Sequence, residues 1–320
     1  MSHSGRMNGL WLDKQGIGFR DNLEVATVAE ADALIAVTYA GLCGTDLELL
    51  RGYAGYEGIP GHEFIGEVID GPPTWRGKRV VADINVSCGE CSYCQGGMAH
   101  HCYSRTVIGI RNRPGAFAQN LAVPVTNLFE VPATVPDQLA VLAEPLAAAI
   151  EITEQVRFAG DERILVLGAG RLAQLVARVL SRSCGQVDVL TRNRERIAQF
   201  EGATVHCIDT PGHAYDVVIE CTGNPEAFNT ALASVRPAGT IVLKSTYESA
   251  LKLDVSRIVV AEIRLLGSRC GPMAQALQWL DQHGDQLGAL TFETFALANH
   301  AEAFDKARQV EPYKVLFAPN

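Results

Sequence analysis

Four closely spaced cysteines constrain this 320-residue chain more than any other feature of its sequence. Cys88, Cys91, Cys94 and Cys102 follow the pattern C-x2-C-x2-C-x7-C, with glycines between them. A structural zinc ion is bound by four such ligands in a tetrahedron. An iron–sulfur cluster also takes four thiolates, and four unconnected thiols are the third alternative. The spacing, in a chain without a signal peptide, favours structural zinc. His100 lies inside the same loop, and we expect it to face solvent.

The overall composition excludes several classes of protein. Lys and Arg number 27 against 36 Asp and Glu, and this net charge of −9 without a long basic run argues against a nucleic-acid partner. No apolar stretch approaches the roughly 20 residues that a membrane span needs. The N-terminus has neither the basic nor the apolar region of a signal peptide, so we expect a cytoplasmic protein.

A second set of metal-ligating side chains is scattered more widely. Cys43 follows Gly41-Leu42, His62 precedes Glu63, and Glu144 precedes a proline. A lone cysteine or histidine is usually structural. Cysteine, histidine and glutamate together, however, can form a three-ligand zinc site with one open position, which is the arrangement that catalytic zinc needs.

A glycine-rich motif of the form G-x-G-x-x-A occupies the middle of the chain. Gly168 is expected to make the turn, and Gly170 lets the backbone approach a pyrophosphate. Arg171 and Leu172 then open a helix whose N-terminus faces the anion, while Ala173 allows close helix–strand contact. Because a strand is expected immediately before the motif, it predicts a dinucleotide-binding site.

The pattern of apolar residues changes near residue 163. Before it, short β-type runs alternate with Gly and Pro; after it, apolar strands alternate with helices, which predicts an α/β fold with a parallel sheet. We expect strands at 33–39, 64–69, 79–84, 164–167, 187–190, 217–220, 240–244 and 313–317, and helices at 140–154, 171–183 and 275–279.

The motifs Gly-Leu-Cys-Gly-Thr-Asp, Pro-Gly-His-Glu and Glu-Pro-Leu-Ala, with the four-cysteine loop, resemble the zinc-dependent medium-chain alcohol dehydrogenase family. The sorbitol, threonine and glucose dehydrogenase branches are the most similar. The resemblance implies a GroES-like β-barrel catalytic domain (1–145 and 273–320) and a Rossmann domain (146–272). It also implies two zinc ions per chain and hydride transfer between an alcohol or carbonyl substrate and a nicotinamide cofactor.

The resemblance also implies roles for residues of the second set. Cys43 and His62 would bind catalytic zinc, and Glu63 and Glu144 are the two candidate carboxylates, since family members differ in which one binds directly.

Two residues after Cys43 belong to an implied proton path. Thr45 matches the family position whose hydroxyl passes the substrate proton. Glu48 stands where relatives commonly have a histidine at the outer end of the relay. It could accept a proton, or it could be an exposed carboxylate.

The end of the second Rossmann strand predicts the cofactor. NAD-specific relatives carry an acidic residue where this chain has Thr191, and Arg192 and Arg194 follow. A missing carboxylate beside two arginines suits a 2′-phosphate, so NADP(H) is predicted over NAD(H). A solvated basic start of a helix is the alternative. Thr222 and Lys244, at the ends of two later strands, are expected near the cofactor, although Lys244 could equally be exposed.

Two other functions are compatible with this scaffold. One is a non-catalytic zinc- and nucleotide-binding protein, and the other is a zinc-independent reductase of the same superfamily. Cys43, Thr45, His62 and a candidate carboxylate argue against the first. Cys43, His62 and the intact four-cysteine loop argue against the second. The substrate is expected to be a small alcohol, aldehyde or ketone that the sequence does not name. Family members are dimers or tetramers, and Ile263–Gly267 is the strand predicted to join the subunits.

Overall fold

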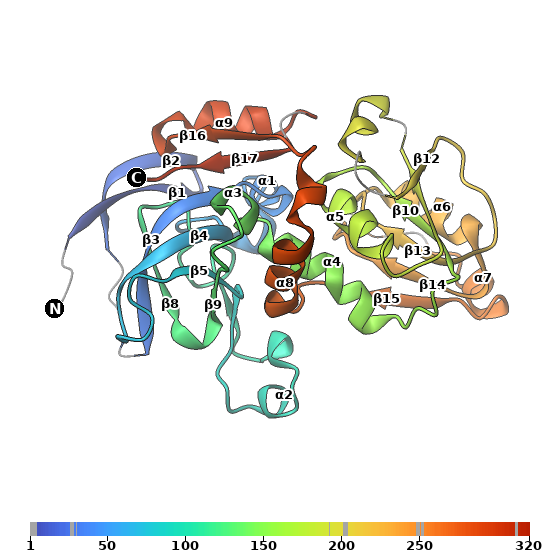
Figure 1. Cartoon of the computed structure of the whole chain (residues 1–320), viewed down its shortest axis with the longest axis horizontal. Coiled ribbons are helices and arrows are strands. Elements are labelled where there is room, and N and C mark those ends of the chain that lie inside the picture. Colours follow the sequence, from blue (N-terminus) through green and yellow to red (C-terminus); the bar gives the residue numbers. More distant parts are fainter. Residues whose placement is uncertain are drawn as a thin grey trace. The chain divides into compact units, whose positions relative to one another are not determined.

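The computed structural model describes residues 5–25, 29, 31–191, 193–200, 204–247, 250, 253–310 and 313–320. The chain divides into two compact units (Figure 1). The first comprises Met1–Glu144, Met273–Gly284 and Leu290–Asn320, and the second Pro145–Pro272 and Asp285–Ala289. Among the described residues, no helix has the length and apolar character that crossing a membrane requires.

The first unit is built on a seven-stranded sheet with the order β16-β17-β3-β4-β5-β9, and β8 also pairs with β3. All of its pairings are antiparallel except that of β16 with β17. Two further two-stranded sheets, β1-β2 and β6-β7, belong to the same unit. The strands of the first unit are β1 (Arg6–Asp13), β2 (Gly16–Glu24), β3 (Asp32–Gly41), β4 (Glu63–Asp70), β5 (Arg79–Ala82), β6 (Asn85–Val86), β7 (Thr106–Val107), β8 (Asn120–Pro124), β9 (Leu128–Glu130), β16 (Phe292–Phe295) and β17 (Lys314–Phe317).

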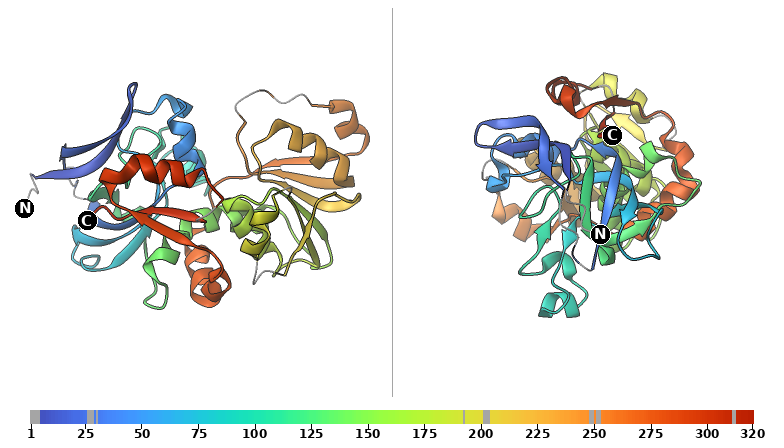
Figure 2. Two further views of the ribbon diagram at one scale, coloured as in Figure 1. Left: turned by 90° about the horizontal axis from the view of Figure 1, so that it is seen from above. Right: turned by 90° about the vertical axis from the view of Figure 1, so that its left-hand side faces the viewer.

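Helices and aromatic rings close the core of this unit. Helix α9 packs on β17 (Figure 2), and the ring of Phe117 meets that of Phe317 edge-on at 4.9 Å. Phe304 of α9 joins the same cluster. The helices are α1 (Gly44–Leu49), α2 (Ser92–Gln95), α3 (Asp137–Ala140), α8 (Met273–His283) and α9 (His300–Ala307), with 3-10 turns at Tyr53–Gly55, Ala99–His101, Val125–Asn127 and Leu297–Asn299.

The helix predicted over 140–154 is divided in the structure. Helix α3 ends at Ala140, and α4 (Ala143–Gln155) begins three residues later. Pro145 explains the break, because proline lacks the N–H that a continuous helix needs and is tolerated in the first turn.

The second unit contains a six-stranded parallel sheet with the order β12-β11-β10-β13-β14-β15. This is the doubly wound order of a Rossmann fold, so the predicted fold class is confirmed. Successive strands are added outward from β10 to β12, and after β12 the chain returns to place β13 on the other side of β10. Helix α5 packs on β10, and α6 packs on β13. The elements are β10 (Arg163–Leu167), α5 (Arg171–Leu180), β11 (Gln186–Leu190), β12 (His206–Ile208), β13 (Tyr215–Glu220), α6 (Pro225–Ser234), β14 (Val235–Leu243), α7 (Val255–Val260) and β15 (Arg264–Gly267), with 3-10 turns at Arg194–Arg196, Ala198–Phe200 and Gly284–Leu287.

A buried arginine holds a distant segment to this second unit. Arg178 of α5 is fully buried and donates from Nε to the carbonyl oxygen of Gln286 at 3.1 Å. Its other nitrogens donate to the carbonyl oxygens of Gln199 at 2.6 Å and Gln174 at 3.2 Å. The structure therefore places Asp285–Ala289 in the second unit, whereas the sequence assigned all of 273–320 to the first.

Candidate active site and metal centres

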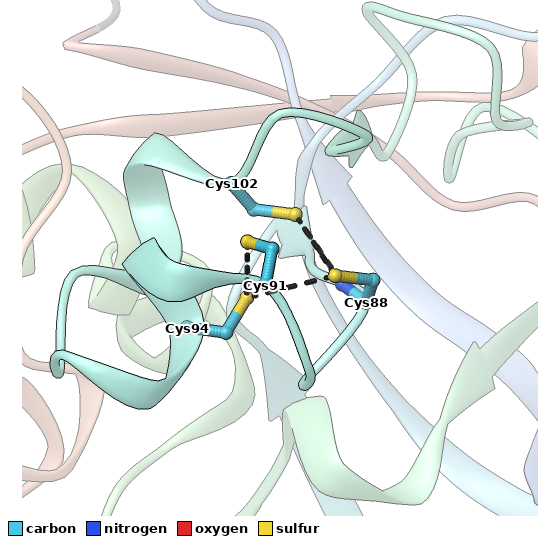
Figure 3. Close-up of side chains that lie close together, drawn as sticks. All are labelled: Cys88, Cys91, Cys94 and Cys102. Carbon is cyan, nitrogen blue, oxygen red and sulfur yellow. Dashed lines mark hydrogen bonds between the residues drawn. The ribbon is translucent and has the colours of Figure 1, made fainter.

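The four cysteines of the first unit point toward one another (Figure 3). The sulfur atoms lie 3.5 Å apart in Cys91 and Cys94, 3.6 Å apart in Cys88 and Cys102, and 3.9 Å apart in Cys88 and Cys94. Ligands at the usual Zn–S distance in a tetrahedron lie about 3.8 Å apart. The four donors thus fit a zinc ion, and they form one of two groups of potential metal ligands among the described residues.

Local backbone geometry shapes this loop. Cys91 precedes α2, and Gly89 and Gly97 adopt positive φ angles of 79° and 76° that favour glycine. The backbone N–H of Cys88 donates to Cys102 Sγ at 3.4 Å. This bond is the main reason that the pKa of Cys102 falls to about 6, which favours the thiolate form that metals bind.

His100 is partly exposed to solvent, as expected of a non-ligand, but its ring also contacts the protein. Its Nε2 atom lies 2.9 Å from Oδ2 of Asp83, just after β5. Asp83 also accepts a hydrogen bond from the backbone N–H of Asn85 at 2.8 Å, and the side chain of Asn127 donates to its carbonyl oxygen at 2.8 Å. His100 therefore anchors the cysteine loop to the segment that follows β5.

The second group of potential ligands consists of Cys43, His62 and Glu63, whose ligand atoms all lie within 4.8 Å of one another. Cys43 lies directly before α1, and Glu63 opens β4. Antiparallel pairing of β3 with β4 sets Gly41 opposite Glu63, which brings segments twenty residues apart together. Strand pairing therefore assembles the cluster that the sequence showed only as scattered residues.

Asp46 orients this cluster. Its Oδ2 atom accepts a hydrogen bond from the backbone N–H of Cys43 at 2.8 Å, and its Oδ1 atom lies 3.4 Å from Nδ1 of His62. Burial alone would lower the pKa of His62, but the neighbouring Asp46 and Cys43 charges outweigh it and raise that pKa well above its usual range. With Nδ1 directed at the carboxylate, the other ring nitrogen is the one that can ligate a metal.

Lys314 is a buried charged residue beside this cluster that the sequence did not indicate. It forms an ion pair with Oε2 of Glu63, and the two side chains are 3% and 1% exposed. A Cβ atom at Gly41 would lie 2.8 Å from Lys314 Cε and 2.9 Å from Glu63 Oε2, so only glycine leaves room for the pair. A lysine inside the apolar strand 313–317 was the signal in the sequence that could have revealed it.

The carboxyl group of Glu144 interacts electrostatically with His62 and Glu63, although it does not belong to the group of three potential ligands. Burial raises the pKa of Glu144 to about 7, the charge of His62 lowers it, and the charge of Glu63 raises it. Whether Glu144 is charged therefore depends on the charges of His62 and Glu63.

The two residues of the expected proton path occupy different surroundings. Thr45 Oγ1 lies 3.8 Å from Cys43 Sγ, so this hydroxyl adjoins the metal cluster. Glu48 forms an ion pair with Arg51 at 2.8 Å and is about one-third exposed.

In the second unit, the glycine-rich motif lies where β10 ends. Gly168 has a φ of 105°, and a Cβ there would lie 3.0 Å from Thr222 Cγ2. Gly170 is the residue before α5, and Arg171 and Leu172 form the first turn of that helix. Thr222 thus contacts the loop at the carboxyl edge of the sheet, where ligands of such folds bind.

Other residues expected at the cofactor site follow the end of β11. The Thr191 hydroxyl is buried and accepts a hydrogen bond from the backbone N–H of Asn193 at 3.1 Å, so it closes a local turn. Arg192 lies outside the described residues, and Arg194 begins the 3-10 turn that follows.

Lys244 makes hydrogen bonds within the second unit. Its ammonium donates to the carbonyl oxygen of Ala148 at 2.6 Å and to Ser268 Oγ at 3.1 Å. It therefore ties the end of β14 to α4 and to the residue after β15, and these bonds direct it into the protein framework.

Comparison with known families agrees with this architecture. The model of the alcohol dehydrogenase GroES-like domain matches residues 29–133, and that of the zinc-binding dehydrogenase matches residues 187–282. Together with the fold, these matches define the chain as an oxidoreductase of the dehydrogenase class. It belongs to the zinc-dependent medium-chain alcohol dehydrogenase family, in the branch that resembles threonine and sorbitol dehydrogenases.

Individual relatives extend over almost the whole chain. L-threonine 3-dehydrogenase of Shewanella frigidimarina is 27% identical, covering 89% of this chain and 91% of the relative. A structure from Sinorhizobium meliloti, described as a zinc-binding dehydrogenase bound to NADP, is 26% identical with a TM-score of 0.86, covering 98% and 100% of the two chains. A structure from Escherichia coli CFT073, described as a short chain alcohol dehydrogenase complexed with NADH, is 26% identical with a TM-score of 0.89, covering 98% and 99%.

Proposed function

We propose that this protein is a zinc-dependent dehydrogenase that transfers a hydride between a small alcohol or carbonyl compound and a nicotinamide cofactor. The observation that carries the proposal is the convergence of Cys43, His62 and Glu63 within 4.8 Å of one another, beside the hydroxyl of Thr45. A zinc-independent reductase would have no need of such a cluster, and a non-catalytic zinc-binding protein would have no need of the Thr45 hydroxyl beside it.

The side chains of the cluster suit a catalytic zinc ion. Glu63 has a buried carboxylate oxygen without a hydrogen-bond partner, which a metal would satisfy. A bound zinc ion would supply a Lewis acid that polarises the substrate oxygen. Cys43 and His62 would hold this ion with Glu63 or Glu144, and the four-cysteine loop would hold a second, structural ion.

Thr45 is the group that we assign to the first proton transfer. Its hydroxyl can accept the substrate hydroxyl proton while passing on its own. Glu48 lies three residues further along α1 and so on the same helical face, with its carboxylate at the solvent end. We therefore propose Thr45 as the inner and Glu48 as the outer end of the proton path.

The cofactor would bind along the carboxyl edge of the parallel sheet. Gly168, Gly170, Arg171 and Leu172 would receive the pyrophosphate at the N-terminus of α5. We propose NADP(H) over NAD(H), because Thr191 supplies no carboxylate to repel a 2′-phosphate. The relatives with bound cofactor include one with NADP and one with NADH, so they favour neither.

A homo-oligomer joined through the second unit is the assembly that we propose, in the cytoplasm. Strand β15 is an edge of its sheet. Leu265 on this strand is 39% exposed, and Val259 and Val260 of α7 are 68% and 85% exposed. An open apolar edge of this kind favours pairing with a second copy. A Leu265→Lys variant should dissociate in light scattering, whereas a wild-type monomer at micromolar concentration would contradict the proposal.

The proposed activity is tested by assays of alcohols, polyols, amino alcohols and aldehydes with both cofactors, on protein whose metal content is measured. About two zinc ions per chain are expected if both four-coordinate sites are filled. Cys43→Ala should abolish turnover and remove one zinc ion while the protein remains folded. Cys207→Ala, a half-buried cysteine of the second unit, is the matched control. Full activity in Cys43→Ala would overturn the assignment.

A further inference from the structure

A buried carboxylate ends strand β13 at the ligand-binding edge of the second unit. Glu220 is completely buried. Among the described residues, the groups that donate hydrogen bonds to its carboxylate are a backbone N–H and two hydroxyls, all of them neutral. Its Oε1 atom accepts bonds from the backbone N–H and the hydroxyl of Thr222, both at 2.5 Å. Its Oε2 atom accepts a bond from the hydroxyl of Tyr247 at 2.6 Å. A buried charge is costly without such partners, so this position calls for an explanation.

The carboxylate determines where the hydroxyl protons point. An ionised carboxylate only accepts hydrogen bonds, so Thr222 and Tyr247 each give Glu220 their single hydroxyl proton. Thr222 Oγ1 also accepts a hydrogen bond from the backbone N–H of Asn224 at 2.9 Å. Toward any other molecule, both hydroxyl groups can therefore only accept hydrogen bonds. A ligand group that meets them must therefore donate.

Both hydroxyls belong to the cofactor edge. Thr222 is exposed, and its Cγ2 atom lies 3.0 Å from the position of a Cβ at Gly168. The N–H of Gly223 donates to Ser245 Oγ at 3.0 Å, which joins this turn to the segment that leads to Tyr247. The ends of β10, β13 and β14 thus meet here, at the point where strand order reverses.

We infer that Glu220 is a positioning residue that fixes Thr222 and Tyr247 as hydrogen-bond acceptors for donor groups of the dinucleotide. Two donors of that cofactor have the required chemistry: the ribose hydroxyls and the carboxamide NH2 of the nicotinamide. This inference rests on the proposed function, because it assumes that the second unit binds a nicotinamide dinucleotide.

The electrostatics of neighbouring groups agree with the geometry. Burial and the hydrogen bond to Glu220 raise the pKa of Tyr247 far above its usual value, so the phenol keeps the proton that it donates. Burial, with the charge of Glu220, raises the pKa of Cys221 to about 12, so this thiol stays neutral.

The test measures dissociation constants by fluorescence and calorimetry for wild type, Glu220→Gln, Tyr247→Phe and Thr222→Val. The ligands are NADH, NADPH, ADP-ribose and the reduced 3-acetylpyridine analogue, which lacks the carboxamide NH2. We expect Glu220→Gln to weaken NADH or NADPH binding about tenfold, because its amide NH2 forces one hydroxyl to reverse. If the carboxamide is the donor, Glu220→Gln should bind ADP-ribose with the same dissociation constant as wild type. The two proteins should then also bind the 3-acetylpyridine analogue equally well. If a ribose hydroxyl is the donor, ADP-ribose weakens too.

A second carboxylate–tyrosine pair supplies the matched control. Asp188 accepts a hydrogen bond from Tyr215 at 2.6 Å and is buried, but Tyr215 begins β13 whereas Glu220 ends it. Asp188→Asn should therefore alter thermal stability without altering cofactor affinity. If Glu220→Gln does not fold, Tyr247→Phe serves as the test variant. This substitution removes only the hydroxyl and keeps the partly exposed ring, so we expect the variant to fold.

Three results would overturn the inference. Wild-type affinity for every ligand in Glu220→Gln and Tyr247→Phe would show that the hydroxyls do not read the cofactor. An equal loss in Asp188→Asn would show a general effect on the sheet. Failure of the wild type to bind any of the dinucleotides would instead refute the proposed function itself.

Discussion

The buried pair of Lys314 and Glu63 supports a prediction that also bears on the choice of metal ligand. Replacing Lys314 with Met keeps the length of the side chain but leaves Glu63, which is 1% exposed, without its cation. Breaking a buried pair in this way costs about 3–5 kcal/mol. We expect Lys314→Met to lower the free energy of unfolding of the metal-free protein by that amount.

The expected loss depends on zinc. If Glu63 is a zinc ligand, the metal charge compensates the carboxylate, so the loss in the zinc-loaded protein should be smaller than in the metal-free protein. If Glu144 is the ligand instead, the loss should be similar in both. The comparison therefore separates the two carboxylates by a stability measurement that needs no substrate.

Urea unfolding followed by tryptophan fluorescence is the appropriate assay. The three tryptophans, Trp11, Trp75 and Trp279, all lie in the first unit, so their emission follows the unit that contains the pair. Lys314→Arg keeps the charge and should lose much less stability. Adding Glu63→Gln to Lys314→Met removes the unpaired charge and should restore most of the stability. The reasoning is refuted if metal-free Lys314→Met unfolds within about 0.5 kcal/mol of wild type.

Three further outcomes are expected. Arg178→Met should cost about 3–5 kcal/mol in urea unfolding monitored by circular dichroism, because three backbone carbonyl oxygens lose their donor; a change typical of a surface substitution would contradict the assigned role. Burial raises the pKa of Asp83, but the hydrogen bonds from His100 and Asn85 outweigh burial and lower that pKa below its usual 3.8. The ionised carboxylate therefore stabilises the folded protein at pH values above 3.8, and this stabilisation should be lost as the pH falls through the lowered pKa of Asp83. Asp83→Asn should flatten that part of the acid unfolding curve, and an unchanged curve would argue against it. A chelator should remove zinc from the cluster at Cys43 before it removes zinc from the four-cysteine loop, as followed by metal analysis, since the loop has no open position; the reverse order would count against the loop as a closed site.

Sequence predicted the features that depend on short spacing. The four cysteines lie within one loop, and the glycine motif lies between a strand and its helix, so local order alone indicates what they form. The alternation of strands and helices after residue 163 likewise predicted the parallel sheet, which the structure confirms.

Features that depend on distant partners were not predictable in this way. Lys314 meets Glu63 only because β17 pairs with β3, and β3 pairs with β4. The position of Lys244 depends on carbonyl and hydroxyl groups from α4 and from the end of β15. The Thr191 hydroxyl accepts a hydrogen bond from the backbone N–H of Asn193 and so takes part in a local turn. Side-chain hydrogen bonding of this kind leaves no periodic pattern in a sequence.

The pairing of β17 with β3 has a consequence for synthesis of the chain on the ribosome. Leu316 and Phe317 lie opposite Gly41 and Ala40, so the sheet of the first unit cannot be completed until the last residues are translated. Contacts between such distant segments form slowly, and an open strand edge is exposed to aggregation meanwhile. Lys314 arrives on that same strand, so the carboxylate of Glu63 lacks its cation during most of translation. The second unit, whose sheet is contained in residues 163–267, can form first. A premature stop near residue 310 would therefore remove both the final strand β17 and the Lys314 cation that pairs with Glu63.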